Sequence, residues 1–262
     1  MPYFKNNGNA IFFELTRSRQ KNNPETIVFL HGAGGNSQSW FYQVQNFSLD
    51  YNCLVLDQRG FGKSETQAKK VTILNFQEDL LNIINFLEME KIHLVGQSMG
   101  GYSALRLACK TPNRVKSLTL SSSNGMISPR SDKTLHPNFK QIEELSKKGI
   151  DWGWSQTAKE NKELRKNYDA IRSKNRKIIN GSTSFEKSES DWISIKKLDD
   201  IKCRTLIIGG NEDPLFPPQL LKKCSKFFNN GHAIILDKCG HSPYLENPQK
   251  FNQALAKHLK IC

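Results

Sequence analysis

The chain has 262 residues, of which 37% are hydrophobic, so it is long enough to bury one large core and to carry an inserted subdomain. Its formal net charge is +13, but the basic residues are spread along the whole sequence without a basic arm or a zinc-finger spacing, which argues against nucleic acid as a partner. The sequence lacks an apolar run of the roughly 20 residues needed to span a membrane and lacks the layout of a signal peptide, so we expect a cytoplasmic protein with no membrane span.

The six cysteines are scattered and show no C-x-x-C spacing, which argues against a metal or redox site and favours a reducing compartment. Cys239 stands out because it lies two residues before His241, where a reactive thiol could take part in chemistry. The alternative is a thiol packed in a loop, which is the commoner role of a free cysteine.

The chain opens with residues 3–15, in which two apolar runs flank NNGN, a pattern that predicts an antiparallel hairpin at the edge of a sheet. Six short apolar runs follow it without the in–out alternation of a half-exposed strand. Runs of this kind indicate strands that are buried on both faces of a parallel sheet. We expect these strands at residues 26–32, 52–57, 91–96, 115–122, 204–210 and 232–237.

Amphipathic segments with helical spacing lie among these apolar runs. Alternation of strand and helix is typical of a doubly wound α/β fold, in which helices cover both faces of the sheet. We expect helices at residues 75–90, 103–110, 217–228 and 247–260.

The alternation stops near residue 126 and resumes near residue 198. We therefore expect a helical insertion at 126–197 that separates the two parts of one α/β core, 1–125 and 198–262. Ligands of open α/β sheets bind beyond the carboxyl ends of the strands, so an insertion at this point would lie over the site as a lid. Its helix-forming segments are residues 138–149, 151–178 and 185–198.

The sequence GQSMG, residues 96–100, falls between a predicted strand and a helix-like segment. It fits the G-x-S-x-G pattern of a nucleophile elbow, a sharp turn that lifts a serine hydroxyl clear of the sheet. The glycines leave room for neighbouring backbone, and the start of the following helix directs N–H groups toward the serine. The same pentapeptide also occurs by chance in loops, but its place directly after KIHLV favours Ser98 as a nucleophile.

A serine hydroxyl is a weak nucleophile at neutral pH and needs a general base within hydrogen-bond reach. His241 is the candidate, because it lies in a loop that follows a predicted strand at the carboxyl edge of the sheet. A carboxylate is then needed to orient the imidazole, and Asp213 also follows a strand at that edge. Glu212, its neighbour, is the alternative acid.

An acyl-transfer site also needs two N–H donors for the tetrahedral oxyanion. The backbone N–H of Met99 would supply one, and that of Ala33, in the loop HGAGG at residues 31–35, would supply the other. HGAGG could instead be an ordinary glycine-rich turn or a phosphate cradle. A phosphate cradle fits less well, because the Walker A lysine and the G-x-G-x-x-G pattern are both missing.

Five motifs together resemble the α/β-hydrolase superfamily, in particular its cap-bearing, serine esterase-like members, and they span nearly the whole chain outside the insertion. The resemblance implies an α/β-hydrolase fold with a mostly parallel eight-stranded sheet flanked by helices, an inserted helical cap, and no metal or organic cofactor. It also implies the order nucleophile, acid, base along the chain, which Ser98, Asp213 and His241 follow. The motifs are HGAGG (31–35), DQRGFGKS (57–64), GQSMGG (96–101), NEDPLFPP (211–218) and GHSPYLENP (240–248).

We therefore expect a serine hydrolase, monomeric or homodimeric, that cleaves an ester or related acyl bond of a small molecule. Two alternatives stay open: a C–C bond hydrolase or lactonase that acts on a small acidic metabolite, and a small-molecule receptor with an intact triad and slow turnover. Substrate contacts are expected from Trp40, Trp152, Trp154 and Phe216, although packing is the commoner role of such side chains.

Overall fold

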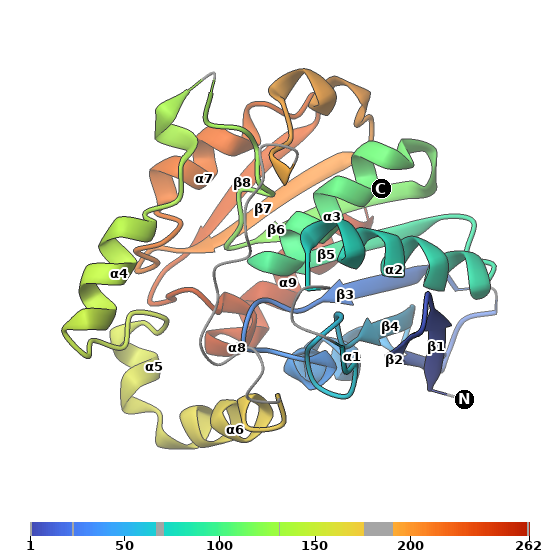
Figure 1. Cartoon of the computed structure of the whole chain (residues 1–262), viewed down its shortest axis with the longest axis horizontal. Helices are drawn as coiled ribbons and strands as arrows, with labels where there is room; N and C mark the ends of the chain where they lie inside the picture. The colour runs from blue at the N-terminus through green and yellow to red at the C-terminus, as the bar shows by residue number, and fades with distance from the viewer. Residues whose placement is uncertain (1, 23, 67–70, 131, 176–190, 261) are drawn as a thin grey trace.

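The computed structural model describes residues 2–22, 24–66, 71–130, 132–175, 191–260 and 262 (Figure 1). Its centre is one eight-stranded sheet with the strand order β1-β2-β4-β3-β5-β6-β7-β8. The first two strands form the predicted hairpin, β2 joins β4 antiparallel, and every later pairing is parallel. The strands are β1 (Tyr3–Asn6), β2 (Asn9–Thr16), β3 (Thr26–Leu30), β4 (Asn52–Leu56), β5 (Ile92–Gln97), β6 (Val115–Ser121), β7 (Arg204–Gly210) and β8 (Gly231–Leu236).

Helices cover both faces of the sheet, and the side chains of β3, β4, β5, β7 and β8 alternate between two apolar layers. On β3, Val28 faces the layer formed with α2 and α3, whereas Phe29 faces the layer formed with α1 and α9. This arrangement confirms the predicted doubly wound α/β fold. The helices of the two layers are α1 (Phe41–Phe47), α2 (Ile73–Phe86), α3 (Met99–Lys110), α7 (Pro218–Ser225), α8 (Pro243–Glu246) and α9 (Pro248–Lys260).

Three of these helices differ from the prediction, and one of them is α8, whose four residues were not expected to form a helix. Helix α1 was not expected, because its seven residues are too few for a clear periodic pattern, and it depends on contacts such as that of Phe47 with Phe29. Helix α3 was expected from residue 103 but begins at Met99, because Gly100 and Gly101 form its first turn instead of delaying it.

The segment between β6 and β7 contains α4 (Phe139–Lys147), α5 (Gln156–Glu160) and α6 (Lys162–Arg172), which lie along one side of the molecule in Figure 1. The helix predicted for 151–178 is divided in two, because Asn161 ends α5 and its side chain caps α6 through the N–H of Leu164 at 3.0 Å. The helix predicted for 185–198 lies partly outside the described residues, and its described end is a 3-10 helix, η7 (Ile195–Asp200). Among the described residues, no helix combines the length and the apolar composition that crossing a bilayer requires.

Candidate active site

Ser98 stands at the turn between β5 and α3. Its backbone has φ 49° and ψ −114°, a strained conformation for a residue with a Cβ atom. The neighbouring glycines explain how the turn is accommodated: a Cβ on Gly96 would lie 2.4 Å from the carbonyl oxygen of Gly100, and a Cβ on Gly100 would lie 2.1 Å from that of Leu30. The turn therefore has the geometry of a nucleophile elbow.

The carboxyl end of β6 packs against this turn with neutral side chains. The hydroxyl of Ser123 donates to the carbonyl oxygen of Ser98 at 2.8 Å, and the amide of Asn124 donates to the carbonyl oxygen of Leu135 at 2.9 Å. An acid at either position would have been a rival to Asp213. Ser123 instead supports the backbone of the elbow, and Asn124 binds the segment that follows β6.

His241 and Asp213 form a hydrogen bond of 2.9 Å between imidazole Nδ1 and carboxylate Oδ2. The other carboxylate oxygen accepts the backbone N–H groups of Leu215 at 2.9 Å and Phe216 at 3.1 Å, and the Asp213 side chain is fully buried. With Nδ1 donating to the carboxylate, Nε2 is left as the proton acceptor of the ring. Glu212, the alternative acid, is exposed and accepts the backbone N–H of Gln156 at 2.7 Å instead.

Two aromatic rings hold the imidazole of His241. Phe216 stacks on it with ring centroids 5.8 Å apart and planes inclined by 10°, and Trp152 lies 5.4 Å away at a tilt. Trp40 and Trp154, which the sequence also suggested as substrate contacts, lie elsewhere: both are buried in the apolar layer formed with α1 and α9. Packing accounts for their positions.

The loop that carries His241 is fixed by Glu246, a residue that the sequence analysis did not single out. One carboxylate oxygen accepts the N–H groups of Gly240 and Ser155, each at 2.9 Å, and the other accepts the N–H of Ser242 at 3.0 Å. Because Ser155 belongs to the segment between β6 and β7, the carboxylate joins that segment to the core. Because α8 was not expected from the sequence, the only signal of this role was an acidic residue just before the helix predicted at 247–260.

Gln97 connects the elbow with the histidine loop. Its amide nitrogen donates to the carbonyl oxygen of His241 at 3.0 Å, and it directly precedes Ser98. The loop after β3 also packs closely against the elbow. A Cβ on Gly32 would lie 1.9 Å from the amide oxygen of Gln97 and 3.1 Å from the Cβ of Ser98. Three strand ends thus meet at one edge of the sheet.

The loop HGAGG makes a tight turn at this edge. The N–H of Gly35 donates to the carbonyl oxygen of Gly32 at 3.1 Å, Gly34 has φ 88°, and Ala33 between them is exposed. The ring of His31 lies beneath the turn and accepts the N–H of Gln58 at Nε2 over 2.9 Å. Burial lowers the pKa of His31, so the ring stays neutral and its Nδ1–H donates to the carbonyl oxygen of Gly32 at 2.8 Å.

Cys239 and the DQRGFGKS motif, both noted in the sequence, lie outside the chemistry of the candidate site. Cys239 is fully buried, and burial raises the pKa of its thiol to about 12, so the nucleophilic thiolate form is disfavoured. Asp57 lies in the loop after β4, where its carboxylate accepts the N–H groups of Ser37 at 2.6 Å and Lys63 at 2.8 Å. That role is structural.

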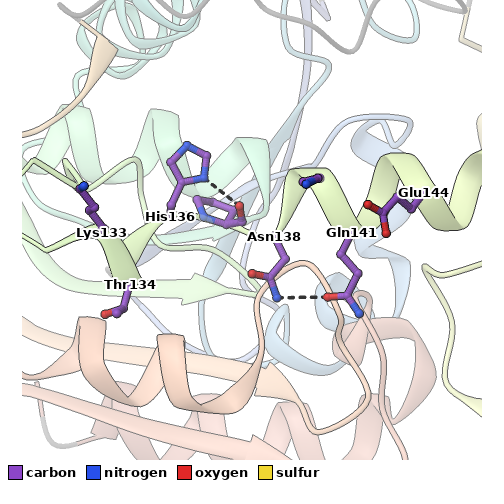
Figure 2. A pocket seen from close by; sticks show the side chains of 8 residues that line it. Lys133, Thr134, His136, Asn138, Gln141 and Glu144 are labelled. Atoms are coloured by element: carbon purple, nitrogen blue, oxygen red, sulfur yellow. Dashed lines mark hydrogen bonds between the residues drawn. The ribbon is translucent and has the colours of Figure 1, made fainter.

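A pocket of about 660 Å³ opens beside the Asp213 loop (Figure 2). Its wall is joined to that loop by Asn138, whose backbone N–H donates to the carbonyl oxygen of Leu215 at 3.0 Å and whose side chain donates to that of Pro214 at 3.1 Å. The side chains that line it are mostly polar, and the predicted site residues are not among them. The lining residues are Lys133, Thr134, His136, Pro137, Asn138, Lys140, Gln141 and Glu144.

Residues 25–248 match the family described as the alpha/beta hydrolase fold. The match covers most of the chain, so the protein belongs to this family of hydrolases, as the five motifs suggested.

Known relatives resemble the chain over nearly its full length. It is 24% identical, over 97% of its length and 95% of the relative's, to an (E)-2-((N-methylformamido)methylene)succinate hydrolase of Acinetobacter baylyi. It is 25% identical, over 90% of its length and 88% of the relative's, to a 2-hydroxy-6-oxo-6-phenylhexa-2,4-dienoate hydrolase of Comamonas testosteroni. Among solved structures, the enol-lactonase of Burkholderia xenovorans LB400 has a TM-score of 0.80 at 21% identity and covers 99% of this chain and 100% of its own.

Proposed function

We propose that the protein is a serine hydrolase that cleaves a carboxylic ester or related acyl bond of a small molecule. The observation that carries this proposal is the hydrogen bond between His241 and the buried carboxylate of Asp213. A second hydrogen bond, from Gln97 to the carbonyl oxygen of His241, joins the histidine loop to the Ser98 turn. Nucleophile, base and acid come from three strand ends at the edge of the sheet where α/β folds bind their ligands.

In the proposed reaction, the hydroxyl of Ser98 attacks the carbonyl carbon while Nε2 of His241 takes its proton. Asp213 holds the ring and stabilises the imidazolium that forms. The backbone N–H groups of Met99 and Ala33 bind the oxyanion; one such donor is worth roughly 100- to 1000-fold in kcat. The imidazolium then protonates the leaving alcohol, and water, activated by the same histidine, releases the acid from the acyl-enzyme.

We also assign residues 126–197 as a cap over the site. Support comes from contacts of its described part with the histidine loop: the N–H of His241 donates to the carbonyl oxygen of Gly153 at 3.1 Å, and Trp152 lies against the imidazole. In this assignment Trp152 and Phe216 form apolar walls of the substrate site.

A serine-directed fluorophosphonate probe tests the nucleophile. We expect stoichiometric labelling at Ser98, none in Ser98→Ala, and strongly reduced labelling in His241→Ala. Ser146→Ala is the matched control, because Ser146 is an exposed serine of α4, and this variant should label like the wild type. Undiminished labelling of Ser98→Ala would exclude Ser98 as the nucleophile.

A second candidate function is hydrolysis of a C–C bond or lactone in a small acidic metabolite. The two relatives named above are hydrolases of a substituted succinate and of a dienoate, both carboxylates, and a net charge of +13 suits an anionic ligand. A panel of esters, lactones, thioesters and ring-cleavage diketo acids separates the two by their kcat/KM values. A single burst of p-nitrophenol without turnover would instead favour the receptor alternative.

A further inference from the structure

The carboxamide of Asn175, which follows α6, joins two loops of the core. Its nitrogen donates to the carbonyl oxygen of Gly34 at 2.7 Å and to that of Gly35 at 3.2 Å. Its oxygen accepts the backbone N–H of Gly62 at 2.8 Å, in the loop after β4. One partly buried side chain of the inserted segment therefore binds three backbone groups of the core.

Asn36 makes a reciprocal connection from the core. Its side chain is buried, and its amide nitrogen donates to the carbonyl oxygen of Ile171 at 2.9 Å and to the amide oxygen of Asn175 at 3.3 Å. The last turn of α6 is thereby held against the HGAGG loop. The contact is polar and directional, so it fixes orientation as well as proximity.

The bonds of Asn175 reach Ala33 through two planar peptide units. The carbonyl of Gly34 shares a plane with the N–H of Gly35, which donates to the carbonyl oxygen of Gly32. That carbonyl shares a plane with the N–H of Ala33, the proposed oxyanion donor. Fixing the Gly34 carbonyl from outside the turn therefore fixes the direction in which the Ala33 N–H points.

The flexibility of Gly34 explains why the turn needs the hydrogen bonds from Asn175. Gly34 has φ 88°, a region that glycine enters freely, and because glycine has no side chain its backbone has no Cβ to restrict rotation. We propose that Asn175 is a positioning residue, supplied by the inserted segment, that orients the HGAGG turn so that the Ala33 N–H can stabilise the oxyanion. This inference rests on the proposed function, since it assumes an acyl-transfer reaction at Ser98.

Asn175→Asp is the variant that tests the donor. It keeps the size of the side chain and the acceptor for Gly62, but it places a charged oxygen against the carbonyl oxygens of Gly34 and Gly35. We expect kcat for an oxoester to fall about tenfold with KM changed less than twofold, because a misplaced donor loses part of the 100- to 1000-fold that one donor contributes. In Asn175→Ala, kcat for the oxoester should fall at least as far.

A matched thionoester separates positioning from a general structural defect. The C=S group accepts hydrogen bonds poorly, so a thionoester gains less from the oxyanion donors than an oxoester does. The oxoester-to-thionoester ratio of kcat should therefore fall in Asn175→Asp, whereas a damaged fold would lower both rates equally. Asn161→Ala is the control, because it removes a cap at the other end of α6 without touching the HGAGG loop, and its ratio should match the wild type.

Amide hydrogen exchange gives a readout that needs no substrate. We expect the amide of Gly35 to exchange faster in Asn175→Asp and Asn175→Ala, and the amide of Gly62 to exchange faster in Asn175→Ala alone. Exchange at Gly35 equal to wild type would overturn the inference whatever reaction the protein catalyses. If the wild type labels and turns over while Asn175→Asp keeps its kcat and its substrate ratio, the inference also fails and the proposed function stands.

Discussion

The sheet and the segment inserted between β6 and β7 are stabilised in different ways. All five residues of β3 are buried, and apolar side chains pack on both of its faces. None of the nine residues of α4, all of which the structure describes, is buried. Elsewhere the described part of the segment packs on the core through apolar side chains such as Trp154 and Leu164, and near the site directional hydrogen bonds are added, among them those of Asn175 and Glu246.

This difference separates two tasks. The sheet holds the proposed nucleophile, base and acid at strand ends whose relative positions follow from close packing, which tolerates little movement. The inserted segment adds directional polar contacts that orient the loops around these strand ends, such as those of Asn175 with the HGAGG loop. We therefore expect changes in the sheet half to cost chemistry or stability outright, and changes in the inserted segment to act mainly on orientation.

The largest effect is expected for Asp213→Asn, in the sheet half. An amide cannot stabilise the imidazolium and favours the wrong tautomer of His241, so kcat should fall by roughly 10³ to 10⁴. Steady-state hydrolysis of a p-nitrophenyl ester measures it. Glu212→Gln is the matched control, because the carboxylate of Glu212 accepts the N–H of Gln156 at the start of α5, and the kcat of this variant should stay within twofold of the wild type. Equal losses in both variants would contradict the assignment of Asp213.

Matched leucine truncations compare the two regions directly. Leu54→Ala removes a fully buried side chain from β4 and should lower the free energy of unfolding by about 2 to 5 kcal/mol. Leu145→Ala removes a half-buried side chain from α4 and should cost less than about 1.5 kcal/mol, because less area leaves contact with protein. Urea unfolding with a common m-value provides both numbers. Equal costs would mean that α4 packs as tightly as the sheet.

The smallest effect is a pH dependence that originates in the sheet half. Burial, together with the charges of His232, Arg204 and His93, lowers the pKa of His258, on α9, to about 3. An unfolded histidine protonates near pH 6.5, so between about pH 6.5 and 3 the unfolded state binds the extra proton and stability falls as the pH is lowered.

His258→Leu should remove part of this slope. Between pH 6 and 5, the free energy of unfolding should fall by about 1.2 kcal/mol less in the variant than in the wild type, if His258 titrates as its pKa indicates. Urea midpoints at pH 7, 6 and 5 measure the difference. Parallel curves for the two proteins would show that His258 does not contribute to acid sensitivity.

Much of the fold could be predicted from the sequence because its signals are local. Six apolar runs marked the parallel strands to within two residues at their ends, and residues 3–15 marked the antiparallel hairpin. The elbow was also readable, because Gly96 and Gly100 are required by contacts within one tight turn. The short helices α1 and α8 and the early start of α3 were missed, because each depends on packing that the local pattern does not encode.

The candidate site was only partly readable for the same reason. Sequence position selected Ser98, Asp213 and His241, but it could not separate Phe216, which stacks on the imidazole, from Trp40, which packs in the core. Both are large apolar residues near a motif. The direction of a side chain depends on the helices and strands packed around it.

The sequence by itself determined which strands the candidate residues Ser98, Asp213 and His241 follow, and it determined the turn that presents Ser98. It could do so because periodicity and glycine spacing act over a few neighbouring residues. Only the tertiary structure decided that Asn175 meets Gly62 across 113 positions of the chain and that Glu246 joins Gly240 to Ser155. Polar side chains of this kind have no local pattern. Their partners are backbone groups that come within hydrogen-bond distance only after the sheet has brought its strand ends to one edge.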